Sequence, residues 1–560
     1  MARHPLDSLF APRSIAVIGG SDRAGSVGQL VLENLRHGEF AGPIHVVNTA
    51  HAEVAGIRCV ANVRELLSAP DLAVICVPAA AIADVLTDCG ARGVRAAIVM
   101  SVGFAERGAI GAELQAELAR IARRYRIRLL GPNCIGFTRP SSKTHALLAR
   151  GSVKPGRLAL VSQSGAVCSA ILDWAHGQGV GFSLAVSVGN AADVAFGDVL
   201  DYLALDYETS AILVYTEGVD RARRFMSGLR AAARIKPVVV LKAGREHEIS
   251  RAAATHTASL LGSDAVFESA LRRAGAVRAT TLEQLFSAAE LLSERRRSAG
   301  PRLAIVTNAG GVGVLAADRA AERGLSLPKL SEATVQKLEA LLPAHWSGGN
   351  PVNLMGDATA ERYAASLRVL LKDDRVDGAI ALVTPLALTE PLAVAHALAA
   401  VSSETRKPLI ASFLGGTQQQ EARAFLHASP VPELSGPEAA VEAFGYLASF
   451  EQSQRMLLEV PASLSERTAP DVVRARALIE AALAEGRNAL SLTEAKTLLR
   501  AFNIPVTQSF FADTPESACA AAMQLGLPVA LKIASPDIPH KSDVDGVRLL
   551  DPDTVAAACE

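Results

Sequence analysis

Two short loops of small residues are the first candidates for chemistry in this sequence. Residues 157–167 (RLALVSQSGAV) and 302–312 (RLAIVTNAGGV) share one pattern, in which an apolar run leads into Ser162-Gln163-Ser164-Gly165 or Thr307-Asn308-Ala309-Gly310. A small-residue loop between a buried strand and a helix leaves backbone N–H groups free to bind an anion. The repeat therefore predicts two similar domains, each with an anion site.

His256 is a candidate nucleophile. It lies in THTAS (255–259), after a predicted strand and the loop 242–245. Neutral imidazole is nucleophilic near pH 7, so a histidine among small residues could accept a phosphoryl group. An exposed loop histidine without a chemical role is the simpler interpretation of this residue alone. Glu217 ends another predicted strand; its carboxylate could orient the imidazole, or it could be an acid favoured by a helix N-terminus.

Lys532 and His540 are candidates for a nucleotide site. Lys532 stands in the apolar run 530–533, where an ammonium group is costly unless it meets an anion, and HKSD (540–543) follows on a polar loop. A strand lysine followed by a polar loop fits nucleoside triphosphate binding. A solvated loop is the alternative interpretation of residues 540–543.

The first region predicts a different nucleotide site. Its glycines stand at 19, 20, 25 and 28, which is not a clean GxGxxG. Asn48-Thr49 occupies the place where an NAD ribose needs a carboxylate. Another nucleotide is therefore favoured, and an oxidoreductase is a minor possibility. The segment GPNCIG (131–136) is equally compatible with a tight turn and with a ligand contact.

Parallel sheets must position these residues. The expected strands are 14–18, 43–47, 72–77, 96–101 and 128–130; 181–188, 211–215 and 237–242; 378–383 and 408–413; and 528–533, besides the two repeated units. Helical segments alternate with them, which predicts doubly wound α/β layers. The expected domains are 8–140, 152–292, 301–455 and 471–560. In the last, Ser491 and Glu494 have capping-box spacing.

Composition narrows the class of protein. A chain of 560 residues with 50% hydrophobic and 4% aromatic residues predicts several α/β domains. The net charge of −1 gives no electrostatic case for nucleic acid or an anionic membrane. Seven scattered cysteines show neither CxxC nor metal-ligand spacing, which predicts no metal site and a reducing compartment. No apolar run is long enough to span a membrane, so we expect a soluble cytoplasmic protein.

Taken together, these motifs resemble the NDP-forming acyl-CoA synthetase superfamily, which includes succinyl-CoA synthetases and ADP-forming acetyl-CoA synthetases. The matching segments are IAVIGGSDRAGSVG, GPNCIG, VSQSGA, SVGNAADVAFGDVLDYLALD, YTEG, THTASLLGSD, TNAGGVGV, GNPVNL and LKIASPDIPHKSD. The resemblance covers nearly the whole chain. It implies a CoA-binding Rossmann domain, two flavodoxin-like succinyl-CoA-ligase domains and the N-terminal part of an ATP-grasp domain.

The resemblance implies a role for each matched residue. His256 matches the phosphorylated histidine, Glu217 the acid that stabilises it, and His540 a second histidine proposed as a relay. Lys532 matches the lysine on the nucleotide phosphates. The implied CoA contacts are Gly20, Ser21, Asn48, Pro78 and Asn133, and the implied phosphate and substrate contacts are Ser162, Ser164, Gly165, Asn308, Gly310 and Gly311.

The implied reaction interconverts acyl-CoA, NDP and phosphate with carboxylate, CoA and NTP, and acetyl-CoA is the expected acyl donor. CoA or acetyl-CoA, ATP or ADP, and Mg²⁺ are the implied cofactors. A homo-oligomer is expected from the family. One branch fuses this module to a GNAT lysine acetyltransferase and uses it as an acetyl-CoA sensor. Segments such as FGDVLDYLALD are closer to that branch, whereas His256 favours an enzyme.

The sequence departs from the family pattern at four places. Thr49-Ala50-His51 replaces a Pro-Lys-type continuation after Asn48, and Ala258 stands where Gly is usual. Asp545-Gly546 replaces Gly-Gly after His540. The rest of the ATP-grasp domain, with its acidic metal-binding residues, is not in this sequence, so the nucleotide half-reaction is not expected from this chain alone.

Overall fold

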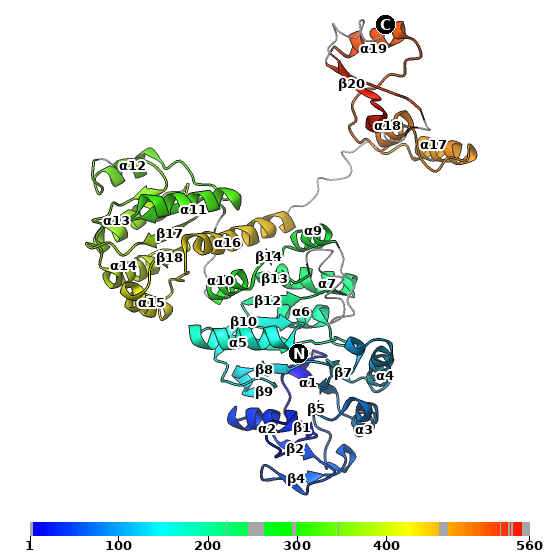
Figure 1. Ribbon diagram of the computed structural model, residues 1–560, viewed down its shortest axis with the longest axis vertical. Helices are drawn as coiled ribbons and strands as arrows, with labels where there is room; N and C mark the ends of the chain where they lie inside the picture. Colours follow the sequence, from blue (N-terminus) through cyan, green and yellow to red (C-terminus); the bar gives the residue numbers. More distant parts are fainter. Residues whose placement is uncertain are drawn as a thin grey trace. The chain divides into compact units, whose positions relative to one another are not determined.

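The computed structural model describes residues 4–219, 221–244, 263–293, 298, 300–344, 346–458, 469–526, 528–535, 538 and 541–550. The chain divides into two compact units. The first ends at Leu458, and the second begins at Glu459. Figure 1 shows the first unit from blue to yellow and the second in orange and red. Among the described residues, no helix combines the length and apolar character needed to cross a membrane.

The first sheet of the first unit has the order β3-β4-β2-β1-β5-β6-β7. Its strands are β1 (Ile15–Ile18), β2 (Ile44–Val47), β3 (Glu53–Val54), β4 (Ile57–Val60), β5 (Leu72–Ile75), β6 (Ala96–Val99) and β7 (Arg128–Leu130). Its helices are α1 (Asp7–Phe10), α2 (Val27–His37), α3 (Ile82–Arg92) and α4 (Ala109–Tyr125). Every residue of β1, β5 and β6 is buried, as expected for parallel strands covered on both faces.

The second sheet has the order β14-β13-β12-β10-β11-β8-β9. Its strands are β8 (Gly136–Arg139), β9 (Thr144–Leu147), β10 (Pro155–Ser162), β11 (Phe182–Ser187), β12 (Ala211–Thr216), β13 (Val238–Lys242) and β14 (Val277–Ala279). Its helices are α5 (Gly165–Gln178), α6 (Phe196–Leu205), α7 (Ala222–Ala233), α9 (Asp264–Ala274) and α10 (Leu282–Ser293). Strands β8 and β9 form an antiparallel hairpin, and β8 pairs with β11. The expected boundary at residue 140 falls inside this hairpin.

The third sheet has the order β16-β15-β17-β18. Its strands are β15 (Leu303–Thr307), β16 (Val352–Asn353), β17 (Gly378–Val383) and β18 (Leu409–Phe413). The helices are α11 (Gly310–Glu322), α12 (Glu332–Glu339), α13 (Ala360–Leu371), α14 (Pro391–Ser403), α15 (Gln420–His427) and α16 (Pro437–Leu458). Figure 1 shows α16 reaching from α11 to α10. One core cluster accordingly contains Leu160, Ile305 and Phe444.

The internal duplication extends through both sheets. In each, the strand of the repeated unit lies between its two parallel neighbours, β11 and β12 beside β10, and β16 and β17 beside β15. A lysine precedes β13 in one copy and β18 in the other, and both lysines make the same kind of hydrogen bond. Lys236 donates to the carbonyl of Asp206 at 2.5 Å, and Lys407 donates to that of Asp373 at 2.7 Å. Both carbonyls lie just beyond the end of a helix, where acceptors lack helical partners.

The second unit is small. It contains α17 (Val472–Ala484), α18 (Leu492–Ala501), α19 (Pro515–Leu525) and the antiparallel pair β19 (Val529–Lys532) and β20 (Val547–Leu550). The predicted capping box is present at the start of α18. The Glu494 amide donates to Ser491 Oγ at 3.3 Å, and the Ser491 amide donates to Glu494 Oε2 at 2.7 Å.

Candidate active site

The second sheet has a topological switch point between β10 and β12. The chain leaves β10 toward β11 and returns on the other side of β10 as β12, so the loops after β10 and β12 diverge at the carboxyl edge. Ligands of open α/β sheets bind in such a crevice. Gln163 follows β10 and Glu217 follows β12.

Gln163 joins the two loops. Its Oε1 accepts hydrogen bonds from Thr216 Oγ1 at 3.1 Å, from the Glu217 amide at 2.9 Å and from the Gly218 amide at 3.2 Å. These bonds use the acceptor end of the side chain, which leaves the Nε2 end as a donor. The partly buried Glu217 is therefore fixed through its backbone at the predicted anion loop.

The predicted serines of this loop are used locally. The buried Ser162 hydroxyl donates to the Ser164 carbonyl at 2.7 Å, and Ser164 Oγ accepts from the Val167 amide at 3.4 Å as the N-cap of α5. A Cβ on Gly165 would lie 2.6 Å from Ile135 Cγ2, so a larger residue does not fit there. Backbone amides of the first turn of α5, rather than these hydroxyls, are the groups suited to an anion.

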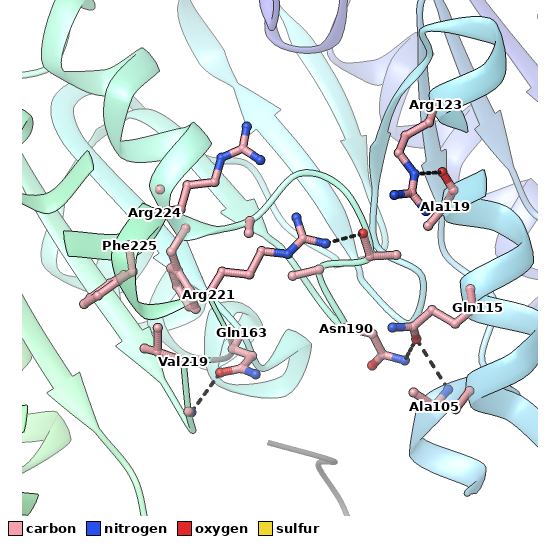
Figure 2. A pocket seen from close by; sticks show the side chains of 18 residues that line it. Ala105, Gln115, Ala119, Arg123, Gln163, Asn190, Val219, Arg221, Arg224 and Phe225 are labelled. Atoms are coloured by element: carbon pink, nitrogen blue, oxygen red, sulfur yellow. Dashed lines mark hydrogen bonds between the residues drawn. The ribbon is translucent and has the colours of Figure 1, made fainter. Parts of the chain in front are cut away.

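A cavity of about 370 Å³ lies next to this switch point. Its lining residues are Ala105, Ala112, Gln115, Ala116, Ala119, Arg123, Gln163, Asn190, Ala191, Ala192, Ala195, Phe196, Gly197, Gly218, Val219, Arg221, Arg224 and Phe225. Figure 2 shows α4 on one side, α7 on the other, and Gln163 between them. Among the described residues, the lining contains arginines but no aspartate or glutamate, so this part of the cavity suits an anionic ligand.

Arginines of α7 and its N-terminal flank reach across this cavity. Arg221 donates to the carbonyls of Ala192 at 2.8 Å and Asp193 at 3.1 Å, whereas Arg224 donates to Asp198 Oδ1 at 2.6 Å. In the described part of the chain, Arg221 has carbonyl partners but no carboxylate partner. Its charge is therefore left to act on a ligand.

The electrostatics of the switch point are set by buried groups. Lys242, buried at the end of β13, is paired in register with Thr216 of β12. Tyr215 lies one residue earlier, and burial raises its pKa, with a further rise from the charge of Glu217. The positive charge of Lys242 and the negative charge of Glu217 thus lie at the same edge of the sheet.

The predicted CoA residues lie at the carboxyl edge of the first sheet. Asn48 Nδ2 donates to the Gly20 carbonyl at 2.8 Å, and Asn48 Oδ1 accepts from the amides of Ala50 at 2.7 Å and His51 at 3.0 Å. Asn48 therefore braces the loops after β1 and β2. Its predicted contact with CoA stays a prediction.

The remaining CoA candidates are spread along that edge. Ser21 Oγ accepts from the Arg23 amide at 3.0 Å, and Pro78 is exposed after β5. Asn133, after β7, donates through Nδ2 to Asn190 Oδ1 at 3.2 Å. Of these CoA candidates, Asn133 contacts a residue that lines the cavity.

The second predicted anion loop lies elsewhere. Asn308, which corresponds to Gln163, donates through Nδ2 to the Thr384 carbonyl at 2.9 Å and accepts from the Thr384 amide at 2.9 Å. The same amide clamp thus joins the central strand to its neighbour in both copies. Gly310 and Gly311 are exposed at the start of α11, and the cavity lining includes none of these residues.

The nucleotide candidates lie in the second unit. Lys532 is exposed on β19, where it pairs with Val547 of β20. Because the ammonium group is exposed, burial creates no need for an anion beside it, and its nucleotide contact stays a prediction. His256 and His540 lie outside the described residues.

The sequence motifs described above do not include Gln115 or Arg221 as candidate site residues, and Asn190 is among them only as part of a longer segment. Asn190 stands in the matched segment SVGNAADV, directly after a glycine, and this was the available signal. Gln115 lies on an amphipathic helix, and no sequence motif around it indicates a functional role. Across the described ranges, His, Cys, Asp and Glu side chains form no group of three that suits a metal ion.

Comparisons with known proteins agree with this arrangement. The chain matches family models described as a CoA binding domain (13–140), a succinyl-CoA ligase like flavodoxin domain (155–292), a Ligase-CoA domain (303–447) and an ATP-grasp domain (481–560). These matches follow the order expected for the α/β architecture.

Three relatives illustrate the likeness. Acetate–CoA ligase [ADP-forming] I of Archaeoglobus fulgidus is 38% identical over 97% of this chain and 77% of its own length. The 4-hydroxybutyrate–CoA ligase [ADP-forming] of Nitrosopumilus maritimus is 32% identical over the same shares, 97% and 77%. The solved dinucleotide-forming acetyl-coenzyme A synthetase 1 of Ca. Korarchaeum cryptofilum, in complex with phosphate and ADP, has a TM-score of 0.77, is 34% identical, and covers 81% of this chain and 99% of its own. With this domain order and these relatives, the chain belongs to the NDP-forming acyl-CoA synthetase family.

Proposed function

We propose that this chain is an acid–thiol ligase that interconverts acyl-CoA, ADP and phosphate with carboxylate, CoA and ATP through a phosphohistidine at His256. One observation carries the proposal. Gln163 fixes the Glu217 loop beside a cavity whose described lining contains arginines and amides and no acid. The ADP-forming ligases among its relatives support the reaction class.

The first steps need an anion site beside the CoA-binding domain. A phosphate oxygen attacks the thioester carbonyl, the C–S bond breaks, and CoA leaves as a thiolate that takes up a proton. A nitrogen of His256 then attacks the phosphorus of the acyl phosphate, and the carboxylate leaves. Catalysis of such transfers rests on positioning and charge stabilisation, which Arg221 and the donor end of Gln163 supply.

Glu217 would accept a hydrogen bond from the other ring nitrogen of His256. That bond orients the imidazole and stabilises its positive charge. The phosphoryl group then passes to an oxygen of ADP, with Lys532 and His540 as the proposed nucleotide-side residues. Mg²⁺ belongs to this second half by family resemblance. The described residues present no ligand set that fits the ion, so we derive no step through it.

The acyl group is proposed to be acetyl, as in the name of the Archaeoglobus relative. The 4-hydroxybutyrate ligase has a comparable likeness, so other carboxylates belong in the same assay. We further propose that the protein forms a homo-oligomer and is located in the cytoplasm. Size-exclusion chromatography with light scattering tests the oligomeric state.

The first half-reaction is the appropriate test because the ATP-grasp domain is partial in this chain. Incubation with acetyl-CoA and radiolabelled phosphate should give acid-labile, base-stable label on the protein and release CoA. His256→Ala should abolish the label. His37→Ala, an exposed histidine of α2, is the control and should keep it. Absence of label on the wild-type chain would refute the proposal.

The alternative is an acetyl-CoA-sensing body of a GNAT acetyltransferase. It predicts that the chain binds acetyl-CoA without forming phosphohistidine or releasing CoA. The same labelling experiment, combined with calorimetric titration of acetyl-CoA, separates the two. The relatives reported above are ligases, which supports the enzyme.

A further inference from the structure

The segment after β11 is fixed onto the CoA-binding domain by its backbone. Gly189 has a φ of +54°, and a Cβ there would lie 2.3 Å from the Pro132 carbonyl oxygen. The next amide, of Asn190, donates to that same carbonyl at 2.9 Å, and the Ala192 amide donates to Gly131 at 3.0 Å. The close contact therefore determines where Asn190 stands.

The Asn190 side chain contacts three groups of the first domain. Its Nδ2 donates to Glu106 Oε2 at 2.6 Å and to Gln115 Oε1 at 2.9 Å, and its Oδ1 accepts from Asn133 Nδ2 at 3.2 Å. Both amide hydrogens and the carbonyl oxygen are thus used. Figure 2 shows Asn190 and Gln115 facing each other at one side of the cavity.

Glu106 is a carboxylate held just outside the cavity. Its Oε1 accepts from the amides of Gly103 at 2.6 Å and Phe104 at 3.0 Å, so Asn190 alone among these partners takes Oε2. Burial raises the pKa of Glu106, but these hydrogen bonds outweigh burial and lower the pKa, which keeps the group charged. Ala105, Gln115 and Asn190 line the cavity, whereas Glu106 does not.

This placement has an electrostatic consequence. An anion in a site with little water is repelled strongly by a carboxylate a few ångströms away. Asn190 and Gln115 line the cavity, whereas Glu106 is held behind its bond to Asn190. Gln115 Oε1 accepts from Asn190, which leaves Gln115 Nε2 as the donor for a ligand. We propose that Asn190 is a positioning residue that keeps the Glu106 carboxylate out of the anion cavity, so that phosphate and the acyl phosphate meet only donors and cations. This inference rests on the proposed function for the identity of the anion.

The experiment measures two quantities on the full chain. These are the half-saturating concentration of phosphate in the labelling reaction with acetyl-CoA, and the dissociation constant of inorganic phosphate by calorimetry. Asn190→Ala should raise both by about tenfold, with the maximal labelling rate changed by less than about threefold, because Glu106 Oε2 then lacks the donor that Asn190 supplied and its charge acts on binding, although the Gly103 and Phe104 amides still hold Oε1. Asn190→Ala/Glu106→Gln should recover most of the lost affinity, because it removes the charge.

A merely structural role of Asn190 predicts otherwise. The double variant would then bind phosphate no better than Asn190→Ala, and the maximal labelling rate would fall together with the phosphate affinity. That result would overturn the inference. Unchanged phosphate affinity in Asn190→Ala would also overturn it. If thermal denaturation shows that Asn190→Ala is unfolded, Asn190→Ser, which keeps a donor of smaller reach, takes its place in the same pair. If the wild-type chain takes up no label, the proposed function fails, and the calorimetric comparison still decides the role of Asn190.

Discussion

Gln163 and Glu217, 54 residues apart in the sequence, meet through one hydrogen bond of 2.9 Å from the Glu217 amide to Gln163 Oε1. The bond crosses the point where the chain reverses its direction of winding in the second sheet. The corresponding bond of the third sheet joins Thr384 to Asn308, also at 2.9 Å. Both copies of the duplicated unit thus keep the clamp, whereas the cavity is found at the first.

Gln163→Ala should impair labelling more than stability. Loss of the shared acceptor removes the hydrogen bonds from Thr216 Oγ1 and from the amides of Glu217 and Gly218, at a cost of about 1–3 kcal/mol in unfolding free energy. The Glu217 loop then loses its position, so phosphohistidine formation should fall by about tenfold or more. Single-turnover labelling with acetyl-CoA and phosphate measures this.

Asn350→Ala is the matched control for that variant. The Asn350 amide also bonds backbone groups of a central strand, accepting from Ile305 at 3.0 Å and donating to Leu303 at 2.8 Å. It lies in the third sheet, so it should cost comparable stability without a specific loss of labelling. Equal labelling rates in Gln163→Ala and wild type would contradict the role given to the clamp.

Asp198→Asn should destabilise the junction between the first two sheets. Asp198 Oδ1 accepts from Arg128 of β7 at 2.9 Å and from Arg224 of α7 at 2.6 Å, and its side chain is 5% exposed. Removal of the buried charge weakens the bonds to both guanidinium groups, of which Arg128 keeps its pair with Asp193, and should cost about 1–3 kcal/mol. Thermal denaturation of the full chain measures the loss.

The exposed pair Glu117–Arg120 on α4 gives the comparison. Glu117→Gln makes the same carboxylate-to-amide change where the side chains are 44% and 61% exposed. It should cost less than about 1 kcal/mol. Similar losses of unfolding free energy in Asp198→Asn and Glu117→Gln would show that the burial of Asp198 does not increase its contribution to stability.

Gly189→Ala tests the backbone contact that places Asn190. An alanine at positive φ costs about 1–2 kcal/mol, and the added Cβ would press on the Pro132 carbonyl. We expect a melting temperature several degrees lower and weaker phosphate binding. Gly177→Ala, on the exposed face of α5 with nothing within 4 Å of its new Cβ, should be neutral or slightly stabilising. A neutral Gly189→Ala would refute the close-contact argument.

Asp373 predicts an acid-dependent stability. Burial acts to raise its pKa, but hydrogen bonds from the amides of Arg375 and Ser331 and from the Thr334 side chain lower it to about 2. A carboxyl group with a lower pKa in the folded state stabilises the fold fully above its unfolded pKa of about 4, and the effect is lost as pH falls toward 2. Asp373→Asn should therefore cost about 2 kcal/mol at pH 7.

Urea denaturation at pH 7 and at pH 3 measures this dependence. The difference between wild type and Asp373→Asn should shrink at the lower pH. The exposed neighbour Asp374 supplies the control, since Asp374→Asn should show a small and nearly pH-independent effect. A cost for Asp373→Asn that is unchanged at pH 3 would contradict the assignment.

The sequence by itself determined most of the long central strands of the sheets and their order along the chain. Continuous apolar runs such as 15–18, 72–75 and 211–216 became buried parallel strands because only strands covered on both faces accommodate such runs. The repeated unit also predicted two similar domains, because similar local chemistry gives a similar strand–loop–helix structure. The family followed from the order of these motifs.

Tertiary structure decided which side chains meet. Short strands such as β16 and the hairpin β8–β9 carry little apolar signal, and their partners lie far away in the sequence. The contact of Asn190 with Glu106 joins residues 84 positions apart, and no local period marks it. Sequence periodicity reports which face of an element is buried, whereas the cavity depends on the packing of α4 and α7 from two different sheets.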